Sequence, residues 1–192
     1  AEMRDRTKMP ILLMTYYNSV YRFGVKRFVE AAARVGVAGL IIPDLPPEEA
    51  GVYRALAGEY GLATVFLAAP TSTSERLRRV AAASSGFIYC VSLTGVTGVR
   101  EHLAGALPEF LQRARQVTDL PLAVGFGISS PQQAREVSHL ADGVIVGSAI
   151  VNLVERLVNG GGSRLAADFN LKTLTDNLEN FVGELRRALD ET

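Results

Sequence analysis

The chain has 192 residues, of which 48% are hydrophobic and 21% are charged, a balance typical of one globular domain with a sizeable core. Lysine plus arginine equals aspartate plus glutamate at 20 each, which argues against a nucleic-acid footprint or a basic membrane-surface patch. No apolar run reaches the ~18 residues that a membrane span needs, and the first ten residues lack the apolar core of a signal peptide. We therefore expect one cytoplasmic domain that binds small molecules or other proteins.

The single cysteine, Cys90, lies within an apolar run. It has no second cysteine with which to form an internal disulfide, which is compatible with a reducing compartment. Because free cysteine behaves as a small hydrophobic side chain, we expect Cys90 to be a buried core residue.

Short apolar segments recur along the chain and are predicted to be β-strands. They are nearly continuous in apolar residues, which is typical of parallel strands covered on both faces. The six segments are 10–16, 38–44, 62–68, 86–92, 120–126 and 142–148. An amphipathic stretch follows each one, so the alternation predicts right-handed βαβ crossovers in an α/β fold.

Two helices have especially clear apolar stripes at three- and four-residue spacing. In the first the stripe consists of Val25, Phe28, Val29, Ala32 and Val35. In the second, expected over 171–189 at the C-terminal end, it consists of Leu171, Leu174, Leu178, Phe181 and Leu185. Each helix is predicted to bury one face.

A doubly wound open sheet and a closed (βα)8 barrel both fit this alternation. Small residues follow the ends of the last three strands, which favours a barrel, because barrels hold phosphate after strands seven and eight. A barrel of ~250 residues carries eight βα units, so six units need ~190. We predict a TIM barrel with six of its eight strands visible, a single domain over 1–192 that lacks about two N-terminal units. The exposed sheet edges of such a chain predict a fragment, or part of a longer protein, and not an independent monomer.

The small residues at these strand ends predict a phosphate site. They are Gly98 in GVTG, Gly127 in GFGIS, and Gly147 with Ser148 in VGSAIV. Backbone N–H groups approach a phosphate only where no Cβ obstructs them, and a helix that opens at Ser148 adds the positive end of its dipole. The alternatives are ordinary turns at the glycines and a helix N-cap at Ser148. A dinucleotide site is disfavoured because GFGIS lacks the third glycine of that motif.

At these residues the sequence resembles the tryptophan synthase alpha subunit family. The matching segments, in family order, are TYYN at 15–18, PDLPPEEA at 43–50, APTS at 69–72, YCVSLTGVTG at 89–98, GFGIS at 125–129 and VGSAIV at 146–151. The resemblance implies a TIM-barrel lyase without metal or organic cofactor. It would cleave indole-3-glycerol phosphate to indole and glyceraldehyde 3-phosphate and pass the indole to a beta subunit in an alpha2beta2 assembly. It implies residence in the cytoplasm, or in the plastid stroma of a plant.

The resemblance also implies roles for individual residues. Gly98, Gly127, Gly147 and Ser148 match its phosphate site, and Thr97 matches a contact with the catalytic loop. Asn18 and Pro46 match positions near the beta subunit. The positions that match the walls of the indole pocket are Met14, Ile41, Leu67, Tyr89, Phe126 and Ile145. Each of these six lies near the end of a predicted strand, where ordinary barrel core is the alternative.

The family's catalytic glutamate and aspartate have no counterpart in this chain. They belong to a motif, E-x-G-x-P-F-S-D-P-x-A-D-G-P, that does not occur in the sequence. Asp44 is the one carboxylate at a predicted strand end, and we expect it to bond to neighbouring backbone in the turn before Pro46. His102 and His139 are expected at the surface. Leu93 stands where some relatives have an arginine.

Three functions remain open on the sequence. The first is the alpha-subunit lyase, inactive as this chain alone. The second is another sugar-phosphate barrel enzyme, which the TYYN and PDLPPEE segments disfavour. The third is a catalytically silent module that binds phosphate ligands or activates a beta-like partner.

Overall fold

The structure is a computed structural model that describes residues 2–92, 100–125, 127–159 and 170–191. Six parallel strands form one sheet in chain order, β1 to β6. They are β1 (Leu12–Met14), β2 (Gly39–Ile41), β3 (Ala63–Ala68), β4 (Ile88–Val91), β5 (Leu122–Gly125) and β6 (Gly143–Ile145). The predicted α/β fold of six parallel strands is therefore confirmed. The strands are shorter than the apolar segments that predicted them.

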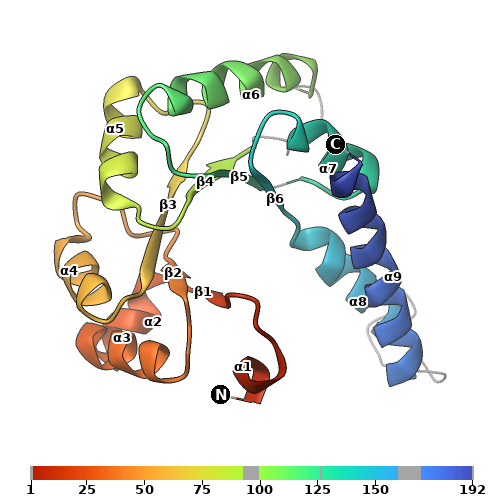
Figure 1. The fold of residues 1–192 in the computed structure, drawn as a ribbon, viewed down its shortest axis with the longest axis horizontal. Helices are drawn as coiled ribbons and strands as arrows, with labels where there is room; N and C mark the ends of the chain where they lie inside the picture. The colour runs from red at the N-terminus through yellow and green to blue at the C-terminus, as the bar shows by residue number, and fades with distance from the viewer. Residues whose placement is uncertain (1, 93–99, 126, 160–169, 192) are drawn as a thin grey trace. The chain divides into compact units, whose positions relative to one another are not determined.

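Helices alternate with these strands (Figure 1). The first five are α1 (Glu2–Arg6), α2 (Tyr17–Phe23), α3 (Val25–Arg34), α4 (Gly51–Glu59) and α5 (Ser74–Ala83). The next four are α6 (Arg100–Arg115), α7 (Pro131–Ser138), α8 (Ser148–Asn159) and α9 (Leu171–Asp190). None of the helices in the described ranges is long and apolar enough to cross a membrane.

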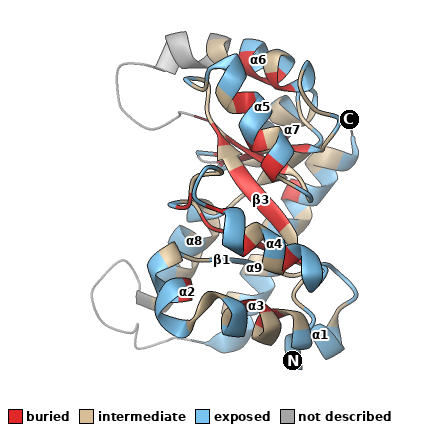
Figure 2. Ribbon diagram, turned by 90° about the vertical axis from the view of Figure 1, so that its left-hand side faces the viewer, coloured by how far each residue is buried: buried red, intermediate tan, exposed pale blue. Residues whose placement is uncertain are grey.

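The chain divides into two compact units. The first comprises residues 1–90 and 112–122, and the second comprises 91–111 and 123–192. In the first unit, α3, α4 and α5 lie beside strands β2 and β3 (Figure 1). The buried residues gather along β3 and on the facing sides of α4 and α5 (Figure 2). Cys90, fully buried at the end of β4, lies in this core as predicted.

Helix starts in both units carry side chains that cap the helix. Thr73 Oγ1 accepts a hydrogen bond of 3.2 Å from the Arg76 N–H at the start of α5. Ser130 caps α7, whose first residue is Pro131, and Asn170 Oδ1 accepts a bond of 2.8 Å from the Lys172 N–H at the start of α9. Each cap pairs an N–H group that has no partner inside the helix.

The predicted apolar stripes are only partly buried. In α3, Val29 and Ala32 are buried, but the helix ends at Arg34, so Val35 lies beyond it and is 41% exposed. In α9, Leu185 is buried whereas Leu171 is 68% exposed. The second unit is held by contacts of α9 with α7 and α8.

Candidate functional site

The predicted phosphate site lies in the second unit, where the N-terminus of α8 and the residues after β5 carry its described members. Gly98 lies outside the described residues. Gly127, Gly147 and Ser148 are all exposed. A phosphate could therefore reach their backbone N–H groups from solvent.

The backbone conformation requires glycine at 127 but not at 147. Gly127 has a φ of +82°, which L side chains rarely adopt, so the backbone itself requires glycine there. Gly147 does not have such a φ, and a Cβ built on it would meet no protein atom within 4 Å. Neither a positive φ nor a close contact in the described part of the chain requires glycine at 147.

Helix α8 begins with Ser148, one residue earlier than an N-cap at Ser148 would place its start. The Gly147 carbonyl accepts hydrogen bonds from the N–H groups of Ile150 at 2.9 Å and Val151 at 3.1 Å. Gly147 therefore occupies the N-cap position, and Ser148 is the first helical residue. The N–H groups before these two, at Ser148 and Ala149, have no acceptor inside the helix and lie at its N-terminal end, where the dipole favours an anion.

The first unit contains four of the six residues predicted to wall an indole pocket. Strand pairing joins Met14 to Ile41 and Leu67 to Tyr89. Ile41 is also paired with Val65, which lies two residues before Leu67 and so points to the same face. The strand register therefore places Met14, Ile41, Leu67 and Tyr89 on one face of this unit's sheet.

Burial differs along that face. Ile41 and Tyr89 are 8% and 5% exposed, whereas Met14 is 53% exposed. Burial raises the pKa of the Tyr89 hydroxyl above its usual value, so Tyr89 stays neutral and can donate a hydrogen bond. In the second unit, Ile145 ends β6 opposite Gly125. Phe126 lies outside the described residues.

The segment after β2 carries Pro46, one of the two predicted partner contacts, and it is tied to α5 by ion pairs. Glu48 carboxylate oxygens lie 2.6 Å from Arg76 Nη1 and 3.3 Å from Arg79 Nη1. The pKa of Glu48 is lowered to about 2, first by a hydrogen bond from its own backbone N–H and then by those from Arg76 and Arg79. Arg79 also pairs with Glu75. Pro46 is half-buried, and Asn18, the other predicted contact, is exposed.

Asp44 makes a different bond from the predicted one. Its Oδ1 accepts a hydrogen bond of 2.8 Å from the Tyr17 N–H, in the first turn of α2, and not from the neighbouring turn before Pro46. The carboxylate is thus a structural cap. His139 is exposed, as predicted. Thr97 and Leu93, and the side chain of His102, lie outside the described part of the chain.

Arg113 is a structural residue that sequence reasoning missed. Its Nη1 and Nη2 donate to the carbonyls of Ser72 at 2.8 Å and Pro70 at 2.7 Å, within the APTS segment. The two bonds fix the turn that follows β3. Arg113 lies 41 residues beyond Ser72. No local sequence pattern links the two residues, so only the fold reveals this hydrogen bond.

The sequence matches the family model for the tryptophan synthase alpha chain over residues 1–185. A tryptophan synthase alpha chain from Roseiflexus castenholzii is 51% identical over 170 residues, which are 88% of this chain and 65% of that protein. One from Dehalococcoides mccartyi is 43% identical over 190 residues, 99% of this chain and 69% of that protein. The chain thus spans about two thirds of the length of these relatives.

Solved structures of the same family share the fold. The alpha subunit from Legionella pneumophila superposes with a TM-score of 0.83 at 29% identity, covering 100% of this chain and 67% of that one. A chain from the tryptophan synthase alpha2beta2 complex of Pyrococcus furiosus gives 0.82 at 37% identity, covering 97% of this chain and 70% of that one. The predicted TIM-barrel family is confirmed, and the chain belongs to the tryptophan synthase alpha chain family.

Proposed function

We propose that this chain carries the substrate-holding part of an indole-3-glycerol phosphate lyase, the alpha subunit of tryptophan synthase. The reaction would split indole-3-glycerol phosphate into indole and glyceraldehyde 3-phosphate by retro-aldol cleavage. Membership in the family supports this proposal. The single structural observation that carries it is the exposed start of α8, where Gly147 and Ser148 are open to solvent and a Cβ on Gly147 has free space around it.

In this proposal the substrate phosphate binds at the start of α8. Its oxygens accept hydrogen bonds from the N–H groups of the first turn, with Gly147 leaving room for close approach. Gly127 and Ser148 contribute to the same site, together with Gly98. The binding energy would orient the substrate for the chemical step.

The indole ring is proposed to pack on the face that Met14, Ile41, Leu67 and Tyr89 share. Phe126 and Ile145, which belong to the second unit, match the same pocket in the family. The neutral Tyr89 hydroxyl can donate a hydrogen bond while its ring packs on a flat substrate. Cleavage also needs positioned groups that protonate the ring and remove the hydroxyl proton. The family's motif for these carboxylates does not occur in the 192 residues, so we propose that this chain binds substrate but does not cleave it alone.

A beta subunit is the proposed partner. The Pyrococcus furiosus relative comes from an alpha2beta2 complex, and the exposed Asn18 and the half-buried Pro46 match family positions near that contact. Thr97 is proposed to contact the catalytic loop. Cytoplasmic residence, or the stroma in a plastid, accords with this role.

Titration of the chain with glycerol 3-phosphate by calorimetry tests the site. We expect saturable binding that Gly147→Ala weakens and Gly147→Asp abolishes, because they add bulk and then negative charge beside the phosphate. Gly58→Ala is the matched control: Gly58 lies in α4, and a Cβ there also meets nothing within 4 Å. Unchanged affinity in both Gly147 variants would refute the phosphate assignment.

An assay of indole release separates the lyase from a silent binding module. The chain alone should bind glycerol 3-phosphate without releasing indole from indole-3-glycerol phosphate. If binding is seen and a longer chain that carries the E-x-G-x-P-F-S-D motif also releases no indole, the silent module is the correct function.

A further inference from the structure

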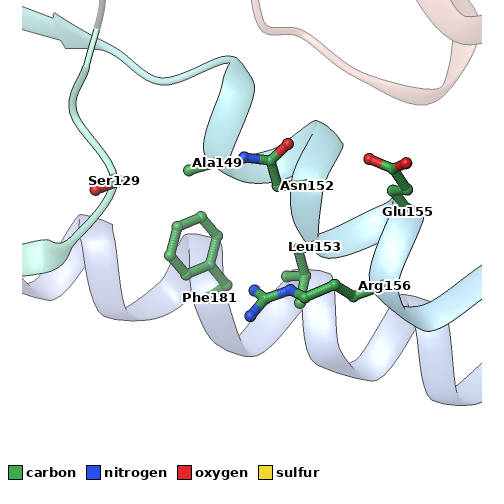
Figure 3. Close-up of a pocket in the computed structure, with 7 residues that line it drawn as sticks. All are labelled: Ser129, Ala149, Asn152, Leu153, Glu155, Arg156 and Phe181. Atoms are coloured by element: carbon green, nitrogen blue, oxygen red, sulfur yellow. The ribbon is translucent and has the colours of Figure 1, made fainter. Parts of the chain in front are cut away.

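A groove of about 440 Å³ lies in the second unit between α8 and α9, beside the residues that follow β5. Figure 3 shows the side chains that line it. They are Ser129, Ala149, Asn152, Leu153, Glu155, Arg156 and Phe181. Its volume falls in the range of small-molecule sites.

One face of α8 supplies most of this lining. Residues 149, 152, 153 and 156 follow the spacing i, i+3, i+4 and i+7, so they share a helix face. Ala149 and Leu153 give that face an apolar centre, and the Phe181 ring of α9 lies opposite them (Figure 3). Ala149, Leu153 and Phe181 are all only partly buried, so an apolar group entering the groove would cover surface that now faces water.

The groove is lined by one anionic and one cationic side chain, Glu155 and Arg156. In Figure 3 the Arg156 guanidinium extends toward Phe181, whereas the Glu155 carboxylate is turned away from Phe181, so the positive charge lies nearer to the apolar centre of the groove. Arg156 makes no ion pair or hydrogen bond with another described residue. The amide of Asn152 adds a donor at the rim of the groove.

We propose that this groove binds a small organic monoanion with an apolar ring or branched body. The body would pack against Leu153, Ala149 and Phe181, and the anionic group would pair with Arg156, which can hold a carboxylate with two parallel hydrogen bonds. A free phosphate matches only the charge and leaves the apolar surface uncovered. An amphipathic carboxylate matches both.

This site is distinct from the proposed phosphate site and does not depend on the proposed lyase function. The phosphate would meet backbone N–H groups at the end of α8, whereas the groove is formed by side chains along the flank of the same helix. The two sites are nevertheless adjacent in sequence, because Ala149 follows Ser148 and Ser129 comes two residues after Gly127.

The test uses phenylacetate, titrated into the 192-residue chain and followed by calorimetry and by amide chemical shifts. We expect saturable binding with shift changes at Ala149, Leu153 and Phe181. Phenylacetamide, which has the same ring without the charge, should bind about tenfold more weakly, and Arg156→Gln should weaken phenylacetate binding about tenfold. Inorganic phosphate should not displace phenylacetate.

A filling variant and its control complete the test. Ala149→Leu places a larger apolar side chain in the groove and should abolish binding, while Val151→Leu changes an α8 residue that is 63% exposed and should leave it unchanged. If Ala149→Leu unfolds the chain, phenylacetate binding by the Arg156→Gln variant, which changes an exposed residue, still tests the proposal. Absence of saturable binding, equal binding of the amide, or displacement by phosphate would overturn the proposal.

Discussion

Asp44 Oδ1 accepts a hydrogen bond of 2.8 Å from the backbone N–H of Tyr17, 27 residues earlier in the chain. The N–H groups in the first turn of α2 have no partner inside the helix, and a carboxylate there also interacts favourably with the helix dipole. The bond joins the segment after β2 to the segment after β1. Asn18 and Pro46, the two proposed partner contacts, lie on the two segments that it holds together.

Asp44→Ala should destabilise the chain by about 1 kcal/mol, the usual effect of losing a helix cap. The measurement is the free energy of unfolding from urea denaturation. Asp44→Asn keeps an acceptor oxygen and should lose less. Asp176→Ala, an exposed aspartate in α9, is the control; a loss there as large as that of Asp44→Ala would contradict the capping role.

Glu48 should make the stability of the chain depend on pH in the acid range. Its pKa is about 2 in the folded chain against an ordinary 4.5. Folding therefore favours the ionised carboxylate. The resulting stabilisation is fully present above pH 4.5 and is lost as the pH falls from there toward 2.

The variant Glu48→Gln removes this contribution, so the stability difference from the parent chain should be largest near pH 6 and shrink as the pH falls through 4. Urea denaturation at several pH values measures it, and added salt should reduce the difference because the ion pairs are exposed. Glu49→Gln is the adjacent control. A difference that does not change between pH 6 and pH 3 would show that Glu48 acts without its charge.

Arg113→Lys should destabilise the turn after β3, even though the charge is kept. A lysine ammonium cannot donate to the Ser72 and Pro70 carbonyls with the two-pronged geometry of a guanidinium. Losing one hydrogen bond between a carbonyl and a charged donor costs about 1.5–3 kcal/mol of stability. Faster amide hydrogen exchange at Ser72, whose N–H bonds to the Ala69 carbonyl, would report the loosened turn. Arg78→Lys on the exposed side of α5 should leave that exchange rate unchanged.

The strands and the family could be predicted from the sequence because both depend on local patterns. The apolar segments identified all six strands, and Cys90 was correctly placed in the core. Long-range polar pairing could not be predicted, because nothing near Asp44 points to Tyr17 and nothing near Arg113 points to Pro70. Strand register is equally non-local: the shared face of Met14, Ile41, Leu67 and Tyr89 follows from pairings between strands.

Natural selection would preserve the two exposed glycines, Gly127 and Gly147, for different reasons. Folding alone would preserve glycine at 127, where the φ of +82° excludes most side chains. Folding places no such demand on 147, where a Cβ is sterically free. Under the proposed phosphate assignment, a lineage that kept the fold but no longer bound phosphate would change at 147 before it changed at 127, so residue 147 would record the loss of the ligand.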